Sequence, residues 1–239
     1  MTPKQFLQAV QKPPLAPGYA LLGNELFYRD HCRQALVKAV LGDDAAARDE
    51  GLVEFDLAEH SLDRLIDDAR TLSLFASSRL IVGFNAEAAL PRKLTDSSPD
   101  ADALARYLKN PTPGVVLLFE STRYDWSDRD DQQRLERLVK FYSVVPQVVR
   151  LPRFTPEEAL AAARILARRL NLSIEADALA DLVEMLGSDM ARLANDLEKL
   201  ALYAGGEREI TAVEIELLVP EARQRGAFEF GRASCRERV

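Results

Sequence analysis

The chain has 239 residues, of which 47% are hydrophobic and 29% are charged, so its composition is that of a globular protein of one or two domains. Its formal net charge of −7 argues against a free-standing nucleic-acid-binding module, because such a module is usually basic over its whole domain. No apolar run approaches the ~20 residues that cross a bilayer, and two cysteines and two histidines make no disulfide framework or zinc-binding pattern, so we expect a reduced, cytoplasmic protein without a metal site.

Up to about residue 150, short apolar runs alternate with amphipathic segments. The run 115–119 is apolar throughout, as expected for a strand that is covered on both faces of a parallel sheet. The expected strands are 19–22, 52–55, 80–82, 115–119 and 144–149, and the expected helices are 26–40, 62–70, 101–108 and 130–141. This alternation predicts an open α/β domain with a parallel sheet over residues 1–150.

The pattern changes after residue 150. Thr155, Pro156 and Glu158 indicate a helix start, because threonine can cap, proline suits the first helical position and glutamate completes a capping box. Thr211 and Glu214 repeat the cap further on. Helices are expected over 159–170, 174–186, 189–203 and 211–219. Residues 151–220 are therefore predicted to form a small all-helical domain.

The end of the chain, residues 231–239, reads GRASCRERV. This is the translation of a common sequencing-library adapter, so we expect the tail to be non-native and assign no role to Cys235. A genuine arginine-rich tail is the alternative. If the tail is foreign, the natural chain continued past Phe230.

An α/β domain followed by a small helical domain is the outline of an ATP-driven module. Such a module has a phosphate-binding loop, G-x-x-x-x-G-K-[ST], after its first strand. Here the first strand is followed by GNELF, residues 23–27, and the dipeptide Gly-Lys occurs nowhere in the chain. Glu25 would oppose a phosphate, and the acidic pair that holds magnesium is reduced to Glu120 followed by Ser121. We therefore predict no ATP site, no cofactor and no metal.

Other catalytic arrangements are equally weak. The carboxylates around Trp126 are better explained as a solvated helix start, because carboxylates favour helix N-termini; they are Asp125, Asp128, Asp130 and Asp131. His31 and Cys32 are adjacent but lack a third partner, and Ser73 lacks the flanking glycines of a nucleophile elbow. We predict no catalytic residue.

The segment 71–79, TLSLFASSR, joins an expected helix to an expected strand. Connections usually lie on the surface, yet Leu74 and Phe75 are large and apolar. Two explanations are open from these residues alone. The pair either packs into the core of the chain, which is the commoner situation, or binds a partner protein.

Three segments, taken in this order, resemble the delta subunit of the bacterial clamp loader, part of the DNA polymerase III holoenzyme. They are residues 19–25, 71–82 and 193–205. The similarity extends from about Tyr19 to Phe230. It implies an AAA+-like fold that has lost ATP binding. It also implies that the apolar turn docks into a hydrophobic pocket of the sliding clamp, the beta ring, and helps to open it.

Residue by residue, the resemblance assigns the clamp contact to Ser73, Leu74 and Phe75, with Leu72 beside them. The chain departs from the family pattern at Arg70, where a glutamine usually stands. It also differs at Met190, where ATPase relatives carry a phosphate-sensing arginine. The first departure affects a polar anchoring contact, and the second agrees with a subunit that does not use nucleotide.

The resemblance further implies a helical collar domain that assembles the loader, of which residues 221–230 would be the beginning. The expected partners are the sliding clamp, the other clamp-loader subunits and primed DNA within the assembled complex, with no membrane. The expected function is that of a non-catalytic subunit in DNA replication, although the holoenzyme is a DNA-directed DNA polymerase and hence a nucleotidyltransferase. The alternative is an ATP-binding clamp-loader subunit or a related AAA+ ATPase, which the missing Gly-Lys disfavours.

Overall fold

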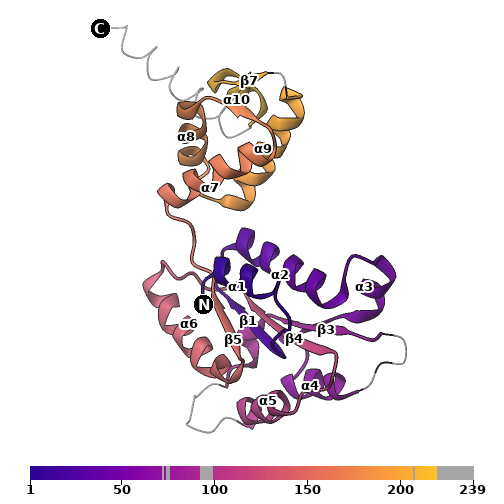
Figure 1. The fold of residues 1–239 in the computed structure, drawn as a ribbon. Helices are drawn as coiled ribbons and strands as arrows, with labels where there is room; N and C mark the ends of the chain where they lie inside the picture. Colours follow the sequence, from indigo (N-terminus) through magenta and orange to yellow (C-terminus); the bar gives the residue numbers. More distant parts are fainter. Residues whose placement is uncertain (72, 74–75, 92–98, 207, 220–239) are drawn as a thin grey trace. The chain divides into compact units, whose positions relative to one another are not determined.

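The computed structural model describes residues 1–219 apart from 72, 74–75, 92–98 and 207 (Figure 1). Two compact units divide the chain, Met1–Arg153 and Phe154–Val239. The sequence analysis placed this division after residue 150. Three of the predicted clamp-binding residues, the expected collar start and the adapter-like tail lie outside the described residues; these are Leu72, Leu74, Phe75, 221–230 and 231–239.

The first unit is organised by a five-stranded sheet in the order β2-β3-β4-β1-β5, with every neighbouring pair parallel. This confirms the predicted open parallel sheet. Each strand follows an apolar run, and β4 is buried along its whole length, as a central strand with both faces covered must be. The strands are β1 (Gly18–Leu22), β2 (Leu52–Asp56), β3 (Arg79–Phe84), β4 (Val115–Ser121) and β5 (Gln147–Arg150).

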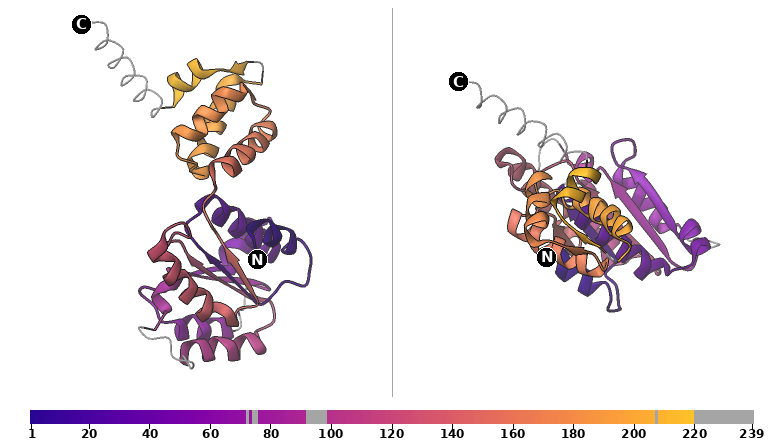
Figure 2. Two further views of the ribbon diagram at one scale, coloured as in Figure 1. Left: turned by 90° about the vertical axis from the view of Figure 1, so that its left-hand side faces the viewer. Right: turned by 90° about the horizontal axis from the view of Figure 1, so that it is seen from above.

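Helices cover both faces of this sheet (Figures 1 and 2). On one face, α1 and α2 pack against alternate strand residues, and Phe6, Leu36 and Leu118 are fully buried there. On the other face, α4, α5 and α6 bury Leu65 and Leu104 against the sheet. The helices are α1 (Pro3–Ala9), α2 (Leu26–Leu41), α3 (Ala45–Gly51), α4 (Leu62–Arg70), α5 (Pro99–Lys109) and α6 (Arg129–Phe141), with short 3-10 helices at Ala86–Ala89 (η1) and Tyr142–Val144 (η2).

Two helices were not predicted, α1 and α3, and each has only seven residues. The start of α1 carries a signal that could have revealed it: Thr2 and Gln5 form a capping box, and Pro3 follows the cap. Asp44 caps α3 in the same way, accepting a hydrogen bond from the Ala47 amide. Short helices show too few turns for a clear apolar period, so the caps carry the information.

The described residues of the second unit form four helices, and both predicted capping boxes are present, Thr155 with Glu158 and Thr211 with Glu214. A two-residue parallel pairing of Ser173–Ile174 (β6) with Glu209–Ile210 (β7) adds to the expected all-helical domain. Pairings this short leave no pattern in a sequence. The helices are α7 (Pro156–Arg169), α8 (Ala176–Met185), α9 (Met190–Ala204) and α10 (Ala212–Leu218). Among the described residues of both units, no helix is long and apolar enough to cross a membrane.

Candidate functional site

The β1–α2 loop, Gly23–Glu25, lies where a phosphate-binding loop would follow the first strand. Gly23 has a φ of +130°, a conformation that other residues rarely adopt. A Cβ atom on this glycine would lie 2.3 Å from the Leu151 carbonyl oxygen and 2.7 Å from the Trp126 ring. The loop is therefore tightly enclosed by its own chain, and glycine is needed there.

Trp126 is the side chain that fills the space next to the loop. Its indole nitrogen donates a 2.8 Å hydrogen bond to the Leu22 carbonyl oxygen. Arg153 holds the loop from another direction, because its Nε donates to the Asn24 Oδ1 at 3.3 Å and lies 2.8 Å from the Asp125 Oδ2. From the sequence, Trp126 was noted only as the centre of an acidic cluster. The packing of Trp126 on Gly23 could not be predicted, because it depends on the sheet order.

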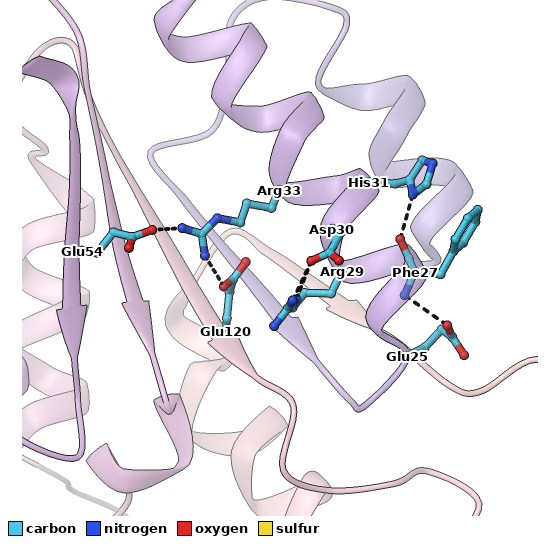
Figure 3. A network of polar contacts seen from close by, with 8 residues as sticks. All are labelled: Glu25, Phe27, Arg29, Asp30, His31, Arg33, Glu54 and Glu120. Atoms are coloured by element: carbon cyan, nitrogen blue, oxygen red, sulfur yellow. Dashed lines mark hydrogen bonds and ion pairs between the residues drawn. The ribbon is translucent and has the colours of Figure 1, made fainter. Parts of the chain in front are cut away.

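Glu25 occupies the start of α2, where a phosphate would be held in a nucleotide-binding protein. The carboxylate accepts a 3.2 Å hydrogen bond from the Phe27 amide, and the residue is only 5% exposed (Figure 3). An internal negative charge thus satisfies the helix N-terminus, which favours anions. A nucleotide would have to displace this carboxylate.

Glu120, the single acidic residue at the end of β4, is neutralised from α2. Its Oε2 lies 2.9 Å from the Arg33 Nη1, and the same guanidinium forms an ion pair with Glu54 on β2 (Figure 3). Because β3 lies between β2 and β4, the Arg33 guanidinium bridges two carboxylates on strands that are not neighbours. An acidic residue in this position was predicted, but its arginine partner was not, because a sequence does not show which arginine faces it.

The environment of Glu120 is unusual for a carboxylate. Its side chain is 3% exposed, and among the described residues its Oε1 has no hydrogen-bond partner. Burial raises the pKa of Glu120, and the charges of Arg33 and Arg29 lower it only in part, so the pKa stays above its ordinary value. Within the described part of the chain, no group of three or more His, Cys, Asp or Glu residues could hold a metal ion.

The structure also describes the surroundings of the other residues that were considered for catalysis. Cys32 is fully buried, and this burial raises the pKa of its thiol to about 12, so it stays protonated. His31 is exposed, with its Nδ1 2.8 Å from the Phe27 carbonyl oxygen. Asp128 caps α6 by accepting from two backbone amides, which is the helix start that was expected there.

The α4–β3 turn, residues 71–78, lies at the opposite end of the strands. Its preceding helix is capped by Ser61 and is anchored by Leu65 and Ile66, which are buried in the core. Thr71 closes the helix by donating its amide to the Asp68 carbonyl oxygen at 3.0 Å.

Within the turn, Ser73 is the one predicted contact residue that the structure describes. It is exposed, and its Oγ accepts a 2.9 Å hydrogen bond from the Ala76 amide. Arg70, which departs from the family pattern, forms an exposed ion pair with Asp67 on its own helix at 3.3 Å. Met190, the other departure, is buried at the start of α9. The exposure of Leu74 and Phe75 stays a prediction.

Two family models match the chain. The model of the DNA polymerase III delta subunit matches residues 19–150, and a model described as a middle domain matches residues 155–217. Among curated proteins, DNA polymerase III subunit delta of Bacillus subtilis is 23% identical over 223 residues, which cover 93% of this chain and 62% of that protein. The chain therefore spans less than two thirds of this relative.

Solved structures show the same fold. The Bacillus subtilis DNA clamp loader delta protein matches with a TM-score of 0.62 and 22% identity, covering 91% of this chain and 62% of that one. Domain III of the Thermotoga maritima replication initiation protein DnaA matches at 0.50 and 16% identity, covering 92% and 90%. A mutant of Thermotoga maritima RuvB matches at 0.51 and 10% identity, covering 92% and 66%. The fold is thus the AAA+-like one that the sequence resemblance implied.

Proposed function

The chain belongs to the family of DNA polymerase III delta subunits, and on this premise we propose that it is a clamp-loader subunit of DNA replication that binds and opens the sliding clamp for loading onto primed DNA. The observation that carries the proposal is the delta-family match over residues 19–150, which includes the α4–β3 turn. This role places the chain in the cytoplasm, in a complex with other clamp-loader subunits.

The clamp contact is proposed for Leu74 and Phe75, with Leu72 and Ser73 beside them. Burying one large apolar side chain contributes ~1.5–3 kcal/mol, so two neighbouring ones can anchor an interface. The described parts of the turn support this role, because α4 and β3 fix its two ends and Ser73 bonds to the Ala76 amide. A turn whose two ends are held in place loses less conformational entropy on binding.

The subunit is proposed to act without nucleotide and without catalysis of its own. Three features of the β1–α2 loop support this: the Glu25 carboxylate at the start of α2, the Trp126 ring against Gly23, and the ion pair of Arg33 with Glu120. An ATP-binding subunit would leave these places to phosphate and magnesium. The alternative of an active ATPase therefore requires the loop to rearrange first.

The experiment that tests the proposal is a titration of the cognate sliding clamp with the purified chain in the absence of ATP. The chain should bind saturably, and replacing Leu74 and Phe75 together by alanine should weaken binding by about a hundredfold or more, at ~1.4 kcal/mol per tenfold. Thermal unfolding of this variant should occur close to that of the wild type, since the substituted side chains serve a partner.

A matched control removes two apolar side chains elsewhere. Leu202 and Val213 in the second unit are 84% and 71% exposed, and their joint replacement by alanine should leave clamp binding unchanged. If the Leu74 and Phe75 variant unfolds while its folded fraction binds the clamp normally, the pair belongs to the core and the proposed contact is wrong.

A further inference from the structure

Arg79, the first residue of β3, is a buried arginine whose side chain contacts the end of α4. The residue is 8% exposed. Its Nη1 donates 3.0 Å hydrogen bonds to the carbonyl oxygens of Asp68 and Thr71, and its Nη2 forms an ion pair with the Asp68 carboxylate. Its guanidinium therefore holds the residues that lead into the α4–β3 turn.

The backbone of Arg79 holds the other end of the same turn. Its amide donates a 2.8 Å hydrogen bond to the Gly114 carbonyl oxygen, and β3 is paired on both sides, with β2 and with β4. Gly114 has a φ of +77°, and a Cβ atom on it would lie 2.6 Å from the Ser77 carbonyl oxygen, so this side of the turn packs closely on the sheet edge. One residue thus connects both ends of the turn to the sheet.

The chemistry of these contacts requires an arginine. The planar guanidinium presents donors in several directions, so it can serve two carbonyls and one carboxylate together, whereas a lysine ammonium is a single compact charge. The last carbonyls of a helix have no partner within the helix, and a cation there is favoured by the helix dipole. Arg79 provides a donor for the Thr71 carbonyl and a second donor for the Asp68 carbonyl, which also accepts the Thr71 amide.

The fold of α4 itself does not depend on this arginine. The helix is capped at its start by Ser61 and buries Leu62, Leu65, Ile66 and Ala69 against the sheet. Removing the guanidinium would leave this apolar anchorage intact and would free the end of the helix and the residues after it. The contacts therefore act on the geometry of the turn more than on the core.

From these contacts we propose that Arg79 is a positioning residue for clamp binding, which holds the two described ends of the α4–β3 turn, between which the proposed contact residues stand in the sequence. This inference rests on the proposed function. Arg79 itself is buried and does not touch the clamp. Its removal would release the end of α4 that leads into the turn, and clamp binding would then have to fix that end at an entropy cost.

The test compares four chains in the clamp titration: wild type, Arg79→Gln, Arg79→Lys and Asp68→Asn. Arg79→Gln should weaken clamp binding about tenfold, at the entropy cost expected for ordering a short loop. Arg79→Lys should rescue only part of this loss, because it keeps the charge without the planar donors. Asp68→Asn keeps both carbonyl contacts and should cause the smallest loss.

Arg134→Gln is the matched control. Arg134 forms a 2.9 Å ion pair with Asp131 within α6, a helix that is separate from α4 and β3. Loss of this ion pair should leave clamp affinity unchanged. Amide hydrogen exchange supplies a readout specific to the turn. The amides of Thr71 and Ala76, which are hydrogen-bonded in the wild type, should exchange faster in Arg79→Gln, while those of β4 keep their protection.

The outcomes separate the two proposals. If the wild-type chain does not bind the clamp, the proposed function fails, and the role of Arg79 fails with it. If the wild type binds and Arg79→Gln binds equally well, the positioning role is wrong and the proposed function stands. Should Arg79→Gln fail to fold, the folded variants Arg79→Lys and Asp68→Asn decide: unchanged affinity in both overturns the inference, and graded losses support it.

Discussion

The two edges of the parallel sheet differ in what surrounds their loops. At the carboxyl ends of the strands, the β1–α2 loop is enclosed by the chain's own groups: Glu25 occupies the helix start, Trp126 packs on Gly23, and Arg33 neutralises Glu120. At the amino ends, Arg79 holds the base of the α4–β3 turn, and the residues between its ends have the sequence LSLFAS. At the carboxyl edge, side chains of the protein itself fill and neutralise the loop. At the amino edge, the base of the turn is hydrogen-bonded, and the sequence between its ends is largely apolar.

Under the proposed function, this difference would let an AAA+-like fold act through a protein contact without a nucleotide. Where a nucleotide would supply negative phosphates and a metal cation, the chain supplies a carboxylate and a guanidinium at comparable places. The charges are balanced without a ligand, so the fold has no electrostatic need of one. Under the proposed function, the binding free energy of the subunit comes from the clamp at the other edge.

The largest effect is expected from Arg33→Met at the carboxyl edge. Removing one partner of a buried ion pair costs about 3–5 kcal/mol, and the lower end applies because the Arg33 side chain is 26% exposed. Urea unfolding at neutral pH measures the loss. Adding Glu120→Gln should restore part of the stability by removing the buried charge. If Arg33→Met is as stable as the wild type, the ion pair of Arg33 with Glu120 does not stabilise this edge of the sheet.

Trp126→Ala removes the ring that packs on Gly23 and so opens the β1–α2 loop without adding a phosphate-binding group. The unfolding free energy should fall by about 2 kcal/mol, because a half-buried indole and its bond to Leu22 are lost. Clamp affinity should not change, since the substitution lies at the opposite edge. Calorimetric titration with ATP and magnesium should still show no saturable heat, because Glu25 remains. Saturable heat would mean that a latent nucleotide site exists there.

The pH dependence of the unfolding free energy measures the contribution of the Glu120 carboxyl. Because its pKa is raised in the folded chain, the folded state binds a proton more readily than the unfolded state, whose carboxyl titrates at about 4.3. This contribution is fully present below the unfolded pKa and is lost as pH rises through the folded one. Arg33→Met raises the folded pKa further.

In Arg33→Met, lowering the pH from neutral to about 5 should therefore recover part of the lost stability, relative to the same change in Glu120→Gln. Urea unfolding of both variants at the two pH values gives this difference directly. The comparison with Glu120→Gln cancels the other carboxylates, of which Asp43 and Asp56 have lowered pKa values and act in the opposite sense. Equal pH dependence in the two variants would show that Glu120 is charged and well solvated.

The smallest effect is expected from Ser61→Ala at the start of α4. Losing an N-cap costs about 1 kcal/mol, here through the bond that Ser61 accepts from the Arg64 amide. The cap lies at the far end of α4 from the turn, so clamp affinity should stay the same although stability falls. A parallel loss of affinity would mean that the turn depends on the whole helix and not on its end alone.

The sequence predicted the elements whose patterns are local. The strand 115–119 is a continuous apolar run, and α4 has the same bounds in the prediction and in the structure, because its cap and its apolar period are strong. The last strand was expected from residue 144 but begins at Gln147, since Tyr142–Val144 form a 3-10 turn that buries Tyr142. An apolar run alone does not distinguish these two.

The long-range contacts of the candidate sites could not be predicted from the sequence. Arg33 meets Glu120 and Trp126 meets Gly23 only because the sheet order brings β4 beside β1 and carries α2 across the sheet. Arg79 appeared in the sequence as the start of a strand, and nothing local shows that its side chain turns back to α4. The assignment of Leu74 and Phe75 came from resemblance, and their predicted exposure is a matter for the clamp titration.

The central claim, that this subunit binds its clamp by one edge while the other needs no nucleotide, is tested most directly by the clamp affinity of the wild-type chain measured with and without ATP and magnesium. Saturable binding with the same Kd is expected in both titrations. Binding that appears only with ATP, or that ATP strengthens by about tenfold (~1.4 kcal/mol), would contradict it, because the β1–α2 loop would then be a working nucleotide site.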